Sequence, residues 1–88
     1  MKHYYADVPG IGNVAVSRHA QAKMEEEHIT PEDFETVLLR GRTIPEGPSI
    51  VWRELNGIRI VILLKPEPFY GATLAKTVFR IQPQARSK

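Results

Sequence analysis

The chain of 88 residues contains no cysteine. Disulfide bonds and thiolate ligands are therefore absent, which excludes a disulfide-stapled secreted scaffold and a Cys-based zinc site. A long apolar run is lacking too: the longest, Ile58 to Leu64, is interrupted by Arg59, whereas a membrane-spanning helix needs roughly 20 residues. The first residues also lack the apolar stretch of a signal peptide. We expect a cytoplasmic protein without membrane contact.

The composition is that of an ordinary folded domain, with 42% hydrophobic and 25% charged residues. This length suits one domain over 1–88 and is too short for two. The net charge is only +2, but it is unevenly distributed. Residues 1–47 carry five Lys or Arg against eight Asp or Glu, and residues 48–88 carry seven against two. A basic second half favours an anionic partner.

Capping residues predict two helices over 17–41. Ser17 is a good N-cap for a helix that starts at Arg18, and Thr30-Pro31 followed by two carboxylates is typical of a second helix start. Gly41 is the expected C-terminal stop. The short turn between the two helices predicts an αα-hairpin. Residues 1–16 contain Pro-Gly and Gly-Asn turn signals, so an N-terminal β-hairpin and a loose extended arm both stay open.

The pattern changes to strands over 49–81. Asn56-Gly57 fits a type I′ turn between Ile50–Leu55 and 58–65, and Thr73 to Ile81 reads as a third strand. The fold class is therefore predicted to be α+β, with the αα-hairpin followed by a three-stranded antiparallel sheet. Residues 82–88 are polar and predict a flexible tail.

The two-residue turn fixes which side chains share a face, with Glu54 opposite Arg59 and Trp52 opposite Val61. One face is nearly all apolar and should receive the helices. Strict alternation leaves the other face open, with Trp52, Glu54, Arg59, Val61, Leu63, Lys65, Leu74, Lys76, Val78 and Arg80. Four cations beside a tryptophan suit a phosphate backbone and a stacked base. The alternative is a solvated sheet face that simply carries long charged side chains.

His19 is the residue best placed for acid–base chemistry. It lies in the first turn of the first predicted helix, where a neutral imidazole can accept a proton. The alternative is a surface histidine without a special role. The three histidines are far apart in sequence and no metal-ligand spacing is present, so we expect neither a metal site nor a cofactor.

The segment from Ser17 to Asp33, SRHAQAKMEEEHITPED, resembles the opening of a family of small bacterial and phage domains of unknown function. Those domains begin with a Ser-x-His-Ala helix, continue through Arg-Met and an Arg-Gly-Ile turn into a second capped helix, and end in a short antiparallel sheet. Two positions differ here, because Lys23 stands where arginine is usual and Glu27-His28 replaces Arg-Gly.

That family is similar to RelE/ParE-type toxins and related metal-independent ribonucleases, so the resemblance implies a RelE-like fold and an endoribonuclease acting on RNA or ribosome-bound RNA. His19 matches the motif histidine and is expected to act as acid or base. No family motif fixes the other site residues. Strand alternation adds Lys76 and Arg80 to the expected catalytic set, and the expected RNA-binding set is Arg18, Trp52, Arg59 and Lys65. The alternative is a non-catalytic bacterial or phage binding or inhibitor protein. An antitoxin-like or host protein partner fits either function.

Overall fold

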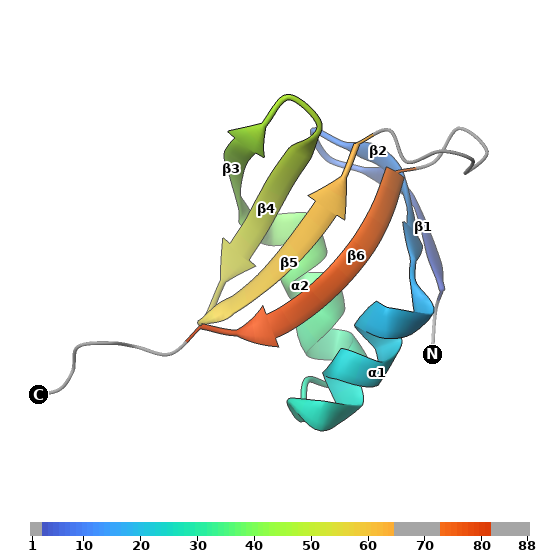
Figure 1. Cartoon of the computed structure of the whole chain (residues 1–88), viewed down its shortest axis with the longest axis vertical. Helices are drawn as coiled ribbons and strands as arrows, with labels where there is room; N and C mark the ends of the chain where they lie inside the picture. Colours follow the sequence, from blue (N-terminus) through green and yellow to red (C-terminus); the bar gives the residue numbers. More distant parts are fainter. Residues whose placement is uncertain (1–2, 65–72, 82–88) are drawn as a thin grey trace, which may run out of the picture.

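The computed structural model describes residues 3–64 and 73–81. Two predictions lie outside these residues: the RNA-binding residue Lys65 and the tail 82–88. The elements are β1 (Tyr4–Val8), β2 (Gly12–Val16), α1 (Arg18–Glu26), α2 (Pro31–Arg40), β3 (Arg42–Gly47), β4 (Ile50–Leu55), β5 (Ile58–Leu63) and β6 (Thr73–Arg80). The strands form one six-stranded sheet in the order β1-β2-β6-β5-β4-β3 (Figure 1). Neither helix in the described residues is long and apolar enough to cross a membrane.

The α+β class agrees with the sequence, but the predicted three-stranded antiparallel sheet and RelE-like layout are wrong. The sheet is mixed, because β2 pairs with β6 in parallel and thereby brings the β1–β2 hairpin into it. β3 was read as a loop because Pro45 and Gly47 are strand breakers. Pro45 is tolerated because β3 pairs only with β4 and forms the edge of the sheet.

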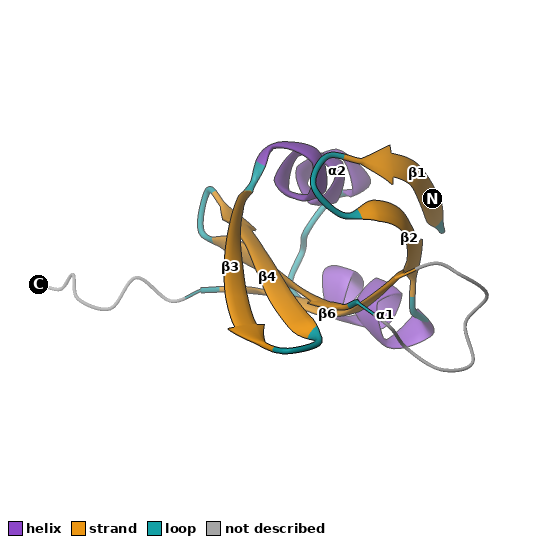
Figure 2. Cartoon of the chain, turned by 90° about the horizontal axis from the view of Figure 1, so that it is seen from above, coloured by secondary structure: helices purple, strands orange, loops and turns teal. Residues whose placement is uncertain are grey.

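The two helices pack separately on the sheet, so the predicted αα-hairpin is also wrong. α2 buries Phe34, Val37 and Leu38 and contacts β4 and β5. α1 buries Ala20 and Met24 and lies against β6, beyond the point where β2 stops pairing (Figure 2). Each apolar stripe therefore faces strands rather than the other helix.

The core forms where the sheet curls around α2 (Figure 2). The rings of Tyr5 on β1 and Phe34 on α2 lie 5.9 Å apart, which places the N-terminal hairpin against the helix. Burial raises the pKa of Tyr5, and the charge of Glu35 raises it further. The hairpin is therefore part of the core and not a loose arm.

Gly41 ends α2 as predicted, but for a different reason. Its φ of −69° is open to any residue, so no left-handed conformation is required. A β-carbon at this position would lie 2.4 Å from the carbonyl oxygen of Val37 and 3.2 Å from the backbone of Glu54. Glycine is needed because the chain passes directly from the helix into β3 beside β4.

One charged side chain is buried in the core. Arg53 on β4 is 5% exposed, and its guanidinium donates to the carbonyl oxygens of Gly41, at 3.0 Å, and Pro9. Burial lowers the pKa of Arg53. Its Nε atom is also buried and has no hydrogen-bond partner within the described residues. Arg53 thus ties the β1–β2 turn to the end of α2.

The β4–β5 hairpin forms as predicted. Asn56 and Gly57 have φ values of 53° and 76°, as a type I′ turn requires. The predicted pairs Trp52 with Val61 and Glu54 with Arg59 are both present. The Asn-Gly signal was therefore sufficient to set the register of this hairpin.

A bulge in β6 changes which residues face outward. Val61 pairs with Thr77 and Ile62 with Ala75, so Lys76 is an extra residue. Beyond it, Val78 pairs with Ile60 and is 0% exposed, whereas Phe79 pairs with Arg59. The predicted outward positions of Val78 and Arg80 are therefore wrong. The open face, opposite α2, consists of Arg42, Ile44, Ile50, Trp52, Glu54, Arg59, Val61, Leu63, Leu74, Thr77 and Phe79.

Candidate functional site

The start of α1 is fixed to the bulge of β6 by Ser17. Its hydroxyl accepts from the amide of Ala20 at 2.9 Å, which caps the helix, and donates to the carbonyl oxygen of Lys76 at 2.8 Å. The Ser17 amide also donates to the carbonyl oxygen of Ala75 at 3.1 Å. These bonds hold two segments 59 positions apart at one corner of the molecule.

Three predicted site residues lie at this corner. Arg18 and His19 form the first turn of α1, and Lys76 is the extra residue of the bulge. All three are exposed, and within residues 3–64 and 73–81 none has an ion pair or side-chain hydrogen bond. The corner, defined by Arg18, His19 and Lys76, therefore combines a proton carrier with two cations and the positive end of a helix.

Arg80 does not join this corner. Its Nε donates to the carbonyl oxygen of Glu27 at 3.0 Å and its Nη2 to that of His28 at 2.9 Å, at the opposite end of α1. A helix of nine residues separates the two ends by roughly 13 Å. Arg80 caps the carbonyl end of α1, where a cation is favoured. Its predicted place beside His19 is therefore wrong.

Trp52 and Arg59 lie on the open face. The Arg59 guanidinium is 3.7 Å from the centre of the Trp52 ring and 5.7 Å from that of Phe79. Its Nε lies 2.5 Å from Oε2 of Glu54. The charge of Arg59 is therefore already matched by a carboxylate, which weakens it as a phosphate ligand. The described residues gather no basic cluster on this face.

Sequence reasoning missed Phe79 on the open face and Ser17 as the residue that fixes the corner. Phe79 was left out of the predicted open face because strict alternation was carried through Lys76, and no residue type in β6 signals the extra position. Ser17 was recognised as a helix cap, but its second hydrogen bond joins α1 to a strand far away in the chain. Such a contact has no signal in the local sequence.

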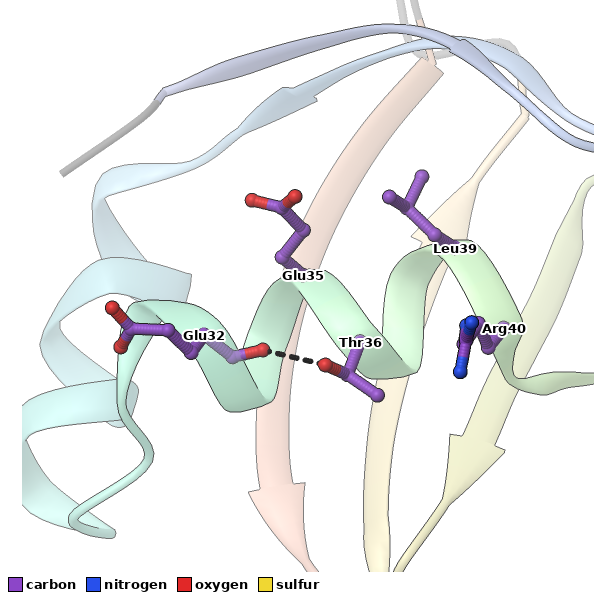
Figure 3. A pocket seen from close by; sticks show the side chains of 5 residues that line it. All are labelled: Glu32, Glu35, Thr36, Leu39 and Arg40. Carbon is purple, nitrogen blue, oxygen red and sulfur yellow. Dashed lines mark hydrogen bonds between the residues drawn. The ribbon is translucent and has the colours of Figure 1, made fainter.

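A separate hollow of about 290 Å³ lies on the exposed side of α2 (Figure 3). Glu32, Glu35, Thr36, Leu39 and Arg40 line it, and the Thr36 hydroxyl donates to the Glu32 carbonyl oxygen at 2.9 Å. All five residues come from one helix. In the described part of the chain, no three His, Asp or Glu side chains gather as a metal site would require.

Comparison with family models, with curated proteins and with solved structures gave no match.

Proposed function

We propose that this protein is a metal-independent endoribonuclease that uses the corner of Arg18, His19 and Lys76. The observation that carries the proposal is the pair of Ser17 hydrogen bonds that holds the backbone of Lys76 beside the start of α1, where Arg18 and His19 lie. In the proposed reaction the ribose 2′-oxygen bonds to the adjacent phosphorus and the bond from phosphorus to the 5′-oxygen breaks. His19 takes the 2′-hydroxyl proton, and the leaving 5′-oxygen takes a proton from water.

The cations have a separate task in this mechanism. Negative charge grows on the non-bridging phosphate oxygens as the 2′-oxygen attacks. Arg18 and Lys76 have no carboxylate partner among the described residues, so their charge is available to those oxygens. Arg59 lacks this property because Glu54 already binds it. The corner therefore fits the reaction better than the centre of the open face.

The test is cleavage of single-stranded RNA in the presence of a metal chelator. The wild type should cleave, and His19→Asn should lose roughly 10²- to 10⁴-fold in rate, as expected for a general acid or base. His28→Asn is the matched control, because His28 is also exposed, lies at the other end of α1, and has a φ of 56° that asparagine tolerates. Equal rates for the two variants, or an inactive wild type, would contradict the proposal.

A second candidate function is a non-catalytic binding or inhibitor protein. The apolar open face favours it, because a sheet surface of half-buried aromatic and aliphatic residues suits contact with another macromolecule. It predicts no RNA cleavage in any buffer. A wild type that cleaves RNA and depends on His19 would exclude it.

A further inference from the structure

A hollow of about 500 Å³ lies at the end of the sheet where the β4–β5 turn meets the end of β6. The turn and the end of β6 lie side by side (Figure 1), because the amide of Ile81 donates to the carbonyl oxygen of Gly57 at 2.8 Å. The residues that line the hollow come from β3, from the β4–β5 hairpin and from the position after β6: Arg42, Glu54, Leu55, Asn56, Gly57 and Ile81. None of them belongs to the corner, so the hollow is a separate place on the molecule.

The hollow has an apolar wall and open space beside it. Leu55 and Ile81 are partly buried aliphatic side chains that line it. Gly57 has a φ of 76°, which favours glycine, and a β-carbon built there would meet no atom of the described residues within 4 Å. Ligand pockets in proteins have volumes of roughly 300–1,000 Å³, with apolar walls and a few polar groups. The size and lining of the hollow therefore suit a small molecule.

The charged groups of the hollow have an excess of positive charge. Oε2 of Glu54 lies 2.5 Å from Nε of Arg59, so this pair is closely made. Oε1 of Glu54 lies 3.8 Å from Nη2 of Arg42, which is too far for a hydrogen bond. Two guanidinium groups thus lie near one carboxylate. Arg42 is the cation that this carboxylate leaves without a close partner.

Arg42 has the donors that an anionic ligand requires. Its side chain is 75% exposed, whereas that of Glu54 is 14% exposed. The guanidinium of Arg42 makes no hydrogen bond within residues 3–64 and 73–81. A planar guanidinium binds a carboxylate through two parallel N–H bonds, and such charge-assisted bonds are stronger than neutral ones. Arg42 can therefore bind an anion at the hollow while the pair of Glu54 and Arg59 stays intact.

The carboxylate of Glu54 limits how much negative charge a ligand can bring. Two arginines against one glutamate leave a single positive charge at the hollow. A carboxylate matches this charge, whereas a dianion such as a phosphate monoester would bring a second negative charge close to Glu54. The aliphatic wall of Leu55 and Ile81 suits an apolar group attached to that carboxylate. Charge and lining together favour an amphipathic monoanion.

We propose that the hollow binds a small carboxylate that carries an apolar body. The ligand carboxylate pairs with the guanidinium of Arg42, and the apolar body packs against Leu55 and Ile81. The side-chain amide of Asn56, which is exposed in the turn, offers a further donor. This inference does not depend on the proposed ribonuclease activity, because the hollow and the corner share no residue.

The test is a titration of the full-length protein with phenylbutyrate, followed through the backbone amide signals in NMR spectra. Phenylbutyrate should shift the amides of Leu55, Asn56, Gly57 and Ile81 until they saturate. The neutral phenylbutyramide, and acetate, which lacks the apolar body, should each bind at least about tenfold more weakly, because each loses one of the two contacts. Equal affinity for phenylbutyrate and its amide, or unshifted signals at these four residues, would overturn the proposal.

Arg42→Gln tests the residue that is proposed to bind the carboxylate. It removes an exposed guanidinium and keeps the pair of Glu54 and Arg59, so the affinity for phenylbutyrate should fall at least about tenfold. Arg40→Gln is the matched control, because it removes the same charge from an exposed side chain at the end of α2, outside the hollow. This control should bind like the wild type. Equal affinities of the two variants would contradict the assignment of Arg42.

Two other results would point to a different ligand or a different place. Inorganic phosphate that shifted the same amides with the affinity of phenylbutyrate would show a general anion site, and the proposed apolar contact would be wrong. Shifts centred on Trp52 and Val61 that persist in Arg42→Gln would place phenylbutyrate on the open face. Either result would overturn the proposed site.

Discussion

Arg53 and Arg59 lie on the two strands of one hairpin, but their side chains point to opposite faces of the sheet and have different partners. Arg53 faces α2, is almost fully buried, and is held by the backbone carbonyls of Pro9 and Gly41. Arg59 faces outward, where it has a carboxylate and an aromatic ring as partners. The first arginine joins distant parts of the chain, whereas the second pairs with neighbours on its own surface. The same residue type therefore makes long-range contacts on one face and local contacts on the other.

The largest effect should come from Arg53→Met. The substitution removes the donors to the carbonyl oxygens of Pro9 and of Gly41, of which the Gly41 bond is buried, so we expect a loss of about 3 kcal/mol in the free energy of unfolding. Urea denaturation measures it. Arg53→Lys is the companion variant, and it should also be destabilised because an ammonium cannot reach both carbonyls as the planar fork does. Wild-type stability in both would show that Arg53 does not tie the hairpin to α2.

Shortening a valine to alanine should have a smaller effect on the free energy of unfolding, and this effect should differ between the two faces of the sheet. Val78 is fully buried against α2's side of the sheet, whereas Val61 is partly exposed on the open face. Val78→Ala should cost about 2 kcal/mol from lost burial and the remaining cavity. Val61→Ala should cost less than about 1 kcal/mol. The reverse order in urea denaturation would contradict the bulge at Lys76.

The Glu54–Arg59 pair should contribute less still. Both side chains are partly solvent-exposed, so we expect a coupling energy of about 0.5–1 kcal/mol. A double-mutant cycle with Glu54→Gln and Arg59→Met measures this coupling in urea denaturation. A coupling near zero would mean that the pair does not hold Arg59, and its charge would then be free for a ligand.

The contact between the C-terminal end of α1 and the end of β6 should make stability depend on pH in the acid range. The pKa of Glu27 is lowered from its ordinary value of 4.5, first by the backbone amide of Arg80 and then by the charge of Lys23, although partial desolvation opposes the shift. The unfolded chain therefore binds this proton more readily, so the stabilisation is present above pH 4.5 and is lost as pH falls through the folded-state pKa.

Glu27→Gln removes this titration. We expect its stability to fall less steeply than that of the wild type between about pH 5 and pH 3. The measurement is urea denaturation at several pH values, with Glu25→Gln as the control because Glu25 is exposed and lies in the same helix. Parallel curves for the wild type and Glu27→Gln would contradict the role of the Arg80 contact.

Local sequence patterns predicted the helices and the β4–β5 hairpin. They failed for elements whose structure depends on contacts between residues far apart in the chain. The caps at Ser17 and Thr30 and the Asn56-Gly57 turn are visible in neighbouring residues, and the helices and the hairpin form there. β3 was missed because the edge position that makes Pro45 acceptable depends on the whole sheet. The parallel pairing of β2 with β6 has no local signature. Strict alternation also failed beyond Lys76, since one extra residue reverses every later side chain.

The candidate site was predicted in part for the same reason. His19 and Arg18 follow from the helix start, and Lys76 was assigned to the predicted catalytic set by strand alternation. The bulge in β6 and the hydrogen bond from the Ser17 hydroxyl together place Lys76 beside the start of α1. Neither the bulge nor this hydrogen bond has a signal in a short sequence motif. Arg80 was assigned by alternation alone and lies instead at the far end of α1. Contacts over long sequence separations therefore decided which predicted residues meet.

The parallel pairing of β2 with β6 also has a consequence for how the protein is made. Asn13 and Thr73 are 60 positions apart and share a hydrogen bond from the Thr73 hydroxyl to the Asn13 carbonyl. On the ribosome the first hairpin emerges early, but the strand that receives it is synthesised later than every other strand in the described sheet. Val14 and Val16 must wait for that strand before they are covered. We expect the nascent chain to complete its sheet only after Arg80 has left the exit tunnel.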